Sequence, residues 1–91
     1  MSATDDACAV IQQAVREAYR NPSWQEAKKK IADAIFNLVA TLDTEPLAYA
    51  RALAEEVGIS LNFCTTATDL EIINIERETE AIRNIARRDA A

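Results

Sequence analysis

The segment SWQEAKKKIADAIFNLVATL, residues 23–42, decides the fold of this chain. Ser23 is followed three residues later by Glu26, which is the spacing of a capping box at the start of a helix. Apolar residues then recur at spacings of three and four, as they do on one buried helix face. These residues are Trp24, Ala27, Ile31, Ala34, Ile35, Leu38 and Leu42. The segment therefore predicts a long amphipathic helix near residues 24–42.

Similar signals predict a helix at each end of the chain. Near the N-terminus, capping residues precede an apolar stripe with helical spacing, and Asn21-Pro22 follows it, so we expect a helix near residues 4–20. In the last third, Thr68 and Glu71 form another capping box. The apolar stripe that follows it predicts a helix near residues 67–88.

Between these helices, the sequence predicts a shorter helix near residues 46–57. Pro46 suits the first turn of a helix, where its missing N–H costs nothing. Gly58 is expected to end the helix in a left-handed conformation. The following segment, Ile59–Phe63, alternates between apolar and polar residues. We expect it to form an extended connector that buries Ile59, Leu61 and Phe63.

The composition agrees with a single helical domain over residues 1–91. Only one Gly and two Pro occur in 91 residues, and hydrophobic residues make up 49% of the chain, which is enough for one core. Short connections make consecutive helices antiparallel, so we predict an all-α fold, a small antiparallel four-helix bundle. In such a bundle Cys8 and Cys64 lie at opposite ends, and we expect both to remain reduced. The expected core is Trp24, Ile31, Ile35, Leu38, Leu53, Ile72, Ile75 and Ile82.

The middle of the chain is strongly acidic. Residues 31–76 carry eight carboxylates and one cation, and the whole chain has a net charge of −5. Such a surface repels phosphate groups and attracts basic surfaces, so we expect a protein partner and no binding to nucleic acid or membranes. The expected binding residues are Glu45, Glu55, Glu56, Asp69 and Glu71. The alternative is that the acidity serves only solubility.

The sequence contains no motif for catalysis or for a cofactor. It has no His, which removes the usual general base and zinc ligand, and it has no Gly-rich phosphate loop. We therefore expect a non-enzymatic protein without metal or cofactor. The chain has no long apolar run and does not begin with a basic region followed by an apolar one. This predicts a cytoplasmic protein without a membrane span or signal peptide.

Two functions from different classes fit these observations. The first is a protein–protein interaction module, such as an inhibitor, an adaptor, an antitoxin-like protein or a phage-type anti-defence protein, that binds a basic surface of its partner. The second rests on the segment ALAEEVGIS, residues 52–60, which resembles the first helix and turn of the helix-turn-helix family. The resemblance implies a small transcriptional regulator that uses residues 47–69. However, the implied recognition helix, residues 61–69, contains no Arg or Lys to contact DNA.

The helix near residues 67–88 has an apolar band wide enough for a second chain. Its first half is mostly acidic and its second half mostly basic, so two antiparallel copies would pair opposite charges. We therefore expect a homodimer that forms through this helix. The expected interface residues are Ile72, Ile75, Ile82, Ile85, Arg83 and Arg87.

Overall fold

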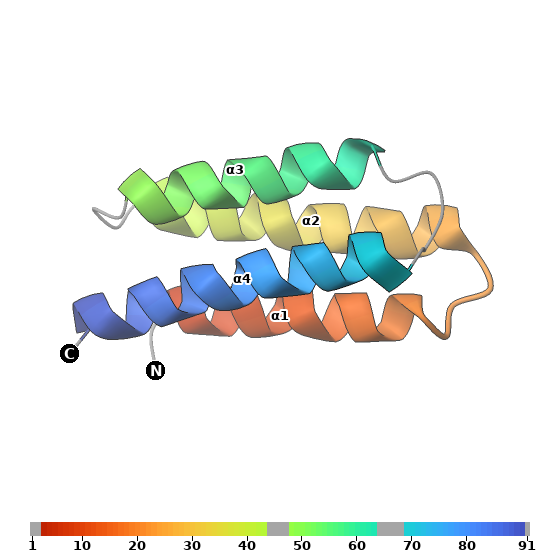
Figure 1. Ribbon diagram of the computed structural model, residues 1–91, viewed down its shortest axis with the longest axis horizontal. Coiled ribbons are helices and arrows are strands. Elements are labelled where there is room, and N and C mark those ends of the chain that lie inside the picture. Colours follow the sequence, from red (N-terminus) through yellow and green to blue (C-terminus); the bar gives the residue numbers. More distant parts are fainter. Residues whose placement is uncertain (1–2, 44–47, 64–68, 91) are drawn as a thin grey trace.

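Four helices make up the computed structural model, which describes residues 3–43, 48–63 and 69–90. They are α1 (Ala3–Ala18), α2 (Trp24–Asp43), α3 (Ala48–Phe63) and α4 (Asp69–Ala90) (Figure 1). The predicted all-α bundle of four helices is confirmed.

The helices lie side by side along the long axis of a bundle that measures 39 × 22 × 20 Å (Figure 1). Consecutive helices run in opposite directions in this view. α1 and α3 each pack against both α2 and α4. Within the described residues, no Cα atoms of the diagonal pairs α1–α3 and α2–α4 lie within 8 Å of each other. Each helix therefore has one face toward the core, one flank against each neighbour and one face toward solvent.

The predicted core residues all pack in the interior, although to different degrees. Six of them are buried, namely Ile31, Ile35, Leu38, Ile72, Ile75 and Ile82. Trp24 and Leu53 are only partly buried and pack against the core from its edge. The buried set also includes Ile11, Val15, Leu42, Val57 and Leu61. Thr79 is the buried polar residue of the α4 stripe, and its hydroxyl donates a hydrogen bond to the Ile75 carbonyl at 2.8 Å, so burial leaves it satisfied.

The connection between α1 and α2 shows how the predicted start of α2 is made. The backbone N–H of Glu26 donates to Ser23 Oγ at 3.4 Å, as the capping-box spacing predicts. The N–H of Ser23 donates to Asn21 Oδ1 at 2.9 Å. In a complete capping box, the Glu26 side chain would accept a hydrogen bond from the Ser23 N–H. Here the Asn21 side chain accepts that bond instead. α1 ends at Ala18, two residues before its predicted end.

The predicted end of α3 at Gly58 is wrong. α3 continues to Phe63, and no described Gly has a positive φ, so Gly58 is an interior helical residue and not a left-handed cap. Continuing the helix places Leu61 on the same buried stripe as Ala54 and Val57. Burying a Leu side chain is worth about 1.5–3 kcal/mol, which exceeds the cost of about 1 kcal/mol for a helical Gly.

The expected extended connector is therefore helical, and its burial differs from the prediction. Leu61 is buried as expected, but Ile59 and Phe63 point to solvent with 58% and 80% of their surface exposed. In a helix these residues cannot share a face with Leu61, because each lies two positions away from it.

The helix-turn-helix interpretation is overturned by the same finding. Its turn was expected at Gly58, within residues 52–60, but these residues lie inside one continuous helix. Leu61–Phe63, the beginning of the implied recognition helix, form the last turn of α3. The resemblance thus reflects an amphipathic helix that contains a Gly.

We predict that Gly58→Ala stabilises the protein. A Cβ at this position would meet Ile35 Cγ2 at 3.6 Å, an ordinary van der Waals distance, and the backbone is already helical. The gain should be about 0.4–1 kcal/mol in urea unfolding, because Ala loses less backbone entropy than Gly. The exposed Ala52 on the same helix provides the matched control: Ala52→Gly should lose about 1 kcal/mol. A loss of stability in Gly58→Ala would contradict the helical conformation of Gly58.

Candidate functional site

The predicted acidic surface is described only in part. Glu55 and Glu56 are exposed on α3. Glu45 lies outside the described residues, and so do the side chains of Asp69 and Glu71, whose backbone begins α4. Glu55 forms an ion pair with Arg51, which lies one helical turn earlier; the distance from Arg51 Nε to Glu55 Oε1 is 3.4 Å. Both side chains remain about half exposed. Such an exposed pair contributes little to stability, so the Glu55 carboxylate remains accessible to a partner.

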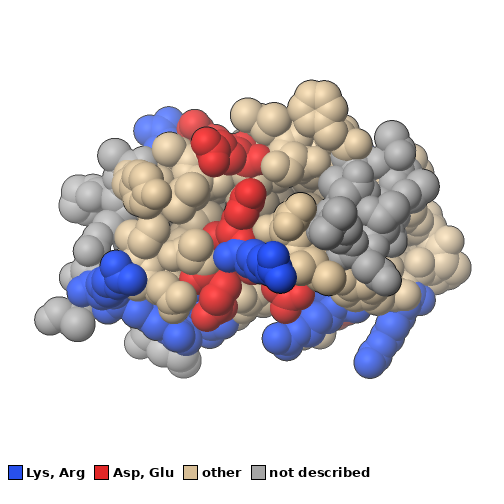
Figure 2. All heavy atoms as spheres, viewed as in Figure 1, with Lys and Arg blue, Asp and Glu red and all other residues tan. Residues whose placement is uncertain are grey.

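The structure adds Glu78 to this acidic region. Burial and, to a smaller extent, the negative charge of Glu56 raise the pKa of the Glu78 carboxyl above its ordinary value. Its Oε2 atom is buried and has no hydrogen-bond partner among the described residues. Acidic side chains gather across the middle of the face formed by α3 and α4 (Figure 2). Like charges thus meet between the consecutive helices α3 and α4, which the residue spacing alone did not reveal.

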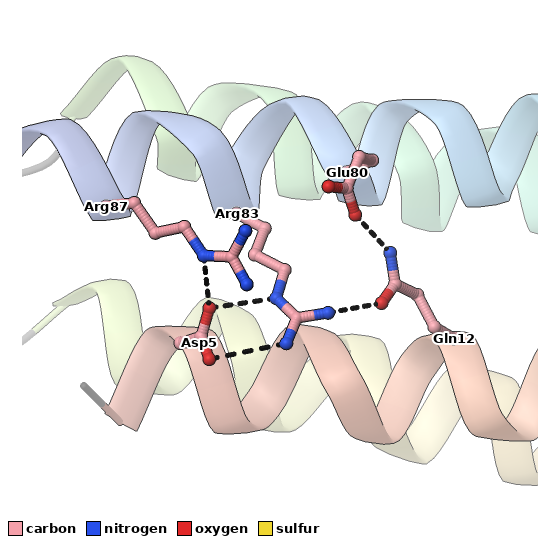
Figure 3. A network of polar contacts seen from close by, with 5 residues as sticks. All are labelled: Asp5, Gln12, Glu80, Arg83 and Arg87. Carbon is pink, nitrogen blue, oxygen red and sulfur yellow. Dashed lines mark hydrogen bonds and ion pairs between the residues drawn. The ribbon is translucent and has the colours of Figure 1, made fainter. Parts of the chain in front are cut away.

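Asp5 on α1 anchors a polar network that joins α1 to α4 (Figure 3). Arg83 donates through Nε to Asp5 Oδ1 at 2.8 Å and through Nη2 to Asp5 Oδ2 at 3.4 Å. Arg87 Nε adds a third contact to Asp5 Oδ1 at 3.1 Å. Arg83 Nη1 also donates to Gln12 Oε1 at 2.8 Å, and Gln12 Nε2 donates to Glu80 Oε2 at 2.7 Å. These contacts fix the register of α4 against α1.

Most residues of the expected dimer interface on α4 contact other residues of the same chain. Ile72, Ile75 and Ile82 are at most 1% exposed in the core, and Ile85 packs against it. Arg83 and Arg87 bind Asp5 of the same chain. A second chain could reach the three buried isoleucines only if the bundle opened. In the closed bundle, the apolar width of α4 serves its own core.

An open apolar groove lies between α2 and α3, and the sequence did not predict it. Its volume is about 480 Å³. α2 contributes Ala32, Ile35, Phe36 and Val39, and α3 contributes Ala54, Glu55, Gly58, Ile59, Leu61 and Asn62. Ile35 and Gly58 approach each other across the groove, whereas Phe36 and Ile59 are 77% and 58% exposed. The groove therefore combines an apolar lining with two large apolar side chains that face water.

More exposed apolar residues continue from the groove along the outer side of α3. Tyr49 and Phe63 are 71% and 80% exposed. With Ala52 and Ile59 they have helical spacing, so they form a second stripe opposite the buried one. Glu56 lies on this stripe, and Glu55 lies beside it. We call the groove and this stripe together the α2–α3 face. The sequence does contain this second stripe. It was missed because the helix was expected to end at Gly58, which would divide the stripe between two segments.

The structure offers little for covalent or metal chemistry. Cys8 is buried, and burial raises the pKa of its thiol to about 12, so it is protonated and unreactive at neutral pH. Cys64 lies outside the described residues. Among the described side chains no cluster of His, Cys, Asp or Glu could hold a metal ion. None of the described helix segments is long and apolar enough to cross a membrane.

Comparisons with known protein families, with curated proteins and with solved structures find no match to this chain. The α2–α3 face is therefore the candidate site on its physical properties alone.

We predict that Asp5→Asn destabilises the protein at neutral pH. Hydrogen bonds and charges from Arg83 and Arg87 lower the pKa of Asp5 below its ordinary value. A carboxylate with a lowered pKa stabilises the fold above its unfolded-state pKa, and this contribution disappears as the pH falls through the folded-state pKa. Wild type should therefore lose stability below about pH 4, and the difference from Asp5→Asn should shrink there. Urea unfolding at pH 7 and pH 3 measures both effects.

The neighbouring Asp6 provides the control for this experiment. Asp6 shares the first turn of α1 but is exposed. Asp6→Asn should thus change stability less than Asp5→Asn at pH 7. If the two variants lose equal stability, the effect comes from the helix dipole and not from the network with α4.

We predict the opposite effect for Glu78→Gln. Because the pKa of Glu78 is raised in the folded protein, its charge opposes folding at neutral pH and this penalty vanishes when acid protonates it. The variant should raise the urea midpoint at pH 7 and lose this advantage below about pH 4. Asp33→Asn, at an exposed position of α2, should leave the midpoint nearly unchanged. A lower midpoint for Glu78→Gln at pH 7 would contradict the unfavourable burial of its charge.

Proposed function

We propose that this protein is a non-enzymatic interaction module whose α2–α3 face binds a basic surface of a partner protein. The observation that carries the proposal is the position of Glu55 and Glu56 among exposed Phe36, Tyr49, Ile59 and Phe63. Exposed aromatic and aliphatic residues that adjoin one another are typical of protein interfaces.

The charge of the chain supports the choice of partner. A net charge of −5 with a pI of about 4.6 attracts basic proteins, and Glu55 and Glu56 extend this attraction to the α2–α3 face. The apolar residues would supply most of the affinity, whereas the carboxylates would speed the encounter and exclude acidic competitors. An inhibitor or adaptor that covers a basic surface on its target would work in this way.

The partner is identified by affinity capture from the host cell with the full chain as bait. We predict that the double variant Glu55→Lys/Glu56→Lys then slows association by about tenfold or more at low salt, with a smaller change in the dissociation rate. The effect should shrink as salt rises, because exposed charges are screened. Biosensor measurements over a range of salt concentrations provide both rates.

The double variant Glu17→Lys/Asp33→Lys is the matched control. Both residues are exposed and lie outside the α2–α3 face, and the change in net charge is the same. It should slow association clearly less than the first variant. If both variants have equal effects, only the total charge matters and the proposed face is wrong. If neither variant nor salt changes association, the partner does not recognise the acidic surface.

A further inference from the structure

We infer that, when no partner is bound, this protein forms a two-fold homodimer in which the α2–α3 faces of two copies cover each other. The inference rests on the apolar area that this face exposes and on the positions of two charged residues in it. The dimer itself does not depend on the proposed function. Its consequence, that the second copy and the partner compete for one face, does rest on that function.

The apolar surface of the α2–α3 face is large enough for a dimer. Among the described residues, four of the seven large apolar side chains that are exposed belong to this face. Phe36, Tyr49 and Phe63 are 77%, 71% and 80% exposed. An aromatic side chain buries about 150–250 Å², so these three expose roughly 300–600 Å² per chain. In two copies, with Ile59 and the groove added, the buried area reaches the roughly 1,000 Å² that a specific interface needs.

The solvent side of α4 offers a second copy much less apolar surface. Ile72, Ile75 and Ile82 lie in the core. Among the described residues of α4, the large apolar side chain that faces water is Ile73, which is 37% exposed. A dimer through α4 would therefore bury little apolar surface unless the bundle opened.

The α2–α3 side of the bundle also carries charges of both signs, which a second copy can match. Lys29 of α2 and Glu56 of α3 are exposed, and neither forms an ion pair with another described side chain. Glu55 contributes less, because Arg51 already pairs with it. In a two-fold dimer, Lys29 of each copy meets Glu56 of the other only if the two residues lie on opposite sides of the symmetry axis.

Two contacts between α2 and α3 show which residues lie at the same level along the bundle. The two helices run in opposite directions (Figure 1). Near the start of α2, Lys28 Nζ donates to the Asn62 carbonyl at 3.4 Å. Two turns later, Ile35 Cγ2 lies 3.6 Å from the position of a Cβ on Gly58. The residues between these two contacts form the middle of the groove.

Lys29 and Glu56 lie on opposite sides of this middle. Ala32 of α2 and Ile59 of α3 line the groove there. Lys29 lies three residues before Ala32, and Glu56 three residues before Ile59. Because the helices are antiparallel, the two charges are displaced by about 4.5 Å in opposite directions. A two-fold axis that lies between the faces and crosses the helices at this level therefore brings Lys29 of each copy level with Glu56 of the other. Their side chains can span the distance between neighbouring helices, which is about 8–10 Å.

Sedimentation equilibrium of the full chain tests the dimer. At about 100 μM protein, which exceeds the Kd expected even of a weak interface of this size, we expect twice the mass of one chain. One chain has a mass of 10.0 kDa. A species of 10.0 kDa at this concentration would overturn the inference.

One variant and one control locate the interface. Phe36→Ser removes an exposed side chain without disturbing the core, and it should weaken dimerisation by about tenfold or more. Ile73→Ser, at the exposed apolar position of α4, should leave dimerisation unchanged. An unchanged dimer in Phe36→Ser, or an equal loss in Ile73→Ser, would place the interface elsewhere and overturn the inference.

A charge exchange tests the arrangement of the two copies. Lys29→Glu and Glu56→Lys each create like-charge contacts at two symmetric places, so each should weaken dimerisation by about fivefold or more. The double variant Lys29→Glu/Glu56→Lys keeps the net charge of −5 and restores opposite charges at both places. It should therefore recover the dimerisation constant of the wild type to within about twofold. If the double variant is as weak as the single ones, these charges do not meet and the inferred dimer is wrong.

The partner that is captured from the host cell separates this inference from the proposed function. If an excess of the partner converts the dimer into a complex that contains one copy of this chain, both are supported. If the partner binds the intact dimer, the dimer stands and the α2–α3 face is not the site of the partner. If the chain is a monomer whose association with the partner responds to Glu55→Lys/Glu56→Lys, the proposed function stands and the inference is wrong.

Discussion

The fold depends on one constraint, which is that four amphipathic helices must bury their apolar stripes in a single shared core. No helix of this chain could bury its stripe alone, and a domain of 91 residues has only one core in which to do so. Each helix accordingly packs against two neighbours and reaches the common interior with Ile, Leu, Val and Ala side chains. Most of the stability of a helix in a protein comes from the packing of its amphipathic face, so the shared core stabilises the secondary structure as well as the tertiary fold.

The contacts between neighbouring helices differ in their charges. Between α1 and α4, opposite charges meet at Asp5, Arg83 and Arg87, and their hydrogen bonds fix how the ends of the chain lie against each other (Figure 3). Between α3 and α4, burial makes the charge of Glu78 unfavourable, and the like charge of Glu56 adds to this. Residues that oppose folding in this way are often retained for binding, where a cation from a partner removes the penalty.

α3 also carries apolar residues that do not contribute to folding. It needs only one buried stripe for the core, yet Tyr49, Ile59 and Phe63 form a second stripe that faces water. Gly58 weakens the interior of the helix and lines the groove toward α2. A sequence selected for stability alone would carry polar residues on the outer stripe and Ala at position 58. Both departures are physically reasonable if this face is covered by a partner, which is why the α2–α3 face and not the α4 band carries the proposed function.

The sequence by itself determined the number of helices, the start of α2 and most of the core. Capping residues and helical spacing are local, and they predicted Ser23 as a cap and Ile31, Ile35 and Leu38 as buried residues. The tertiary structure alone decided where α3 ends, because the local preference of Gly58 to stop a helix was outweighed by the burial of Leu61 against other helices. It likewise decided which charges meet: Arg83 lies 78 residues from Asp5 along the chain, and no spacing rule connects them. The same packing buries most of the apolar band of α4 in the core and leaves the second apolar stripe of α3 exposed to solvent. Which stripe is buried depends on how all four helices pack and not on either helix alone.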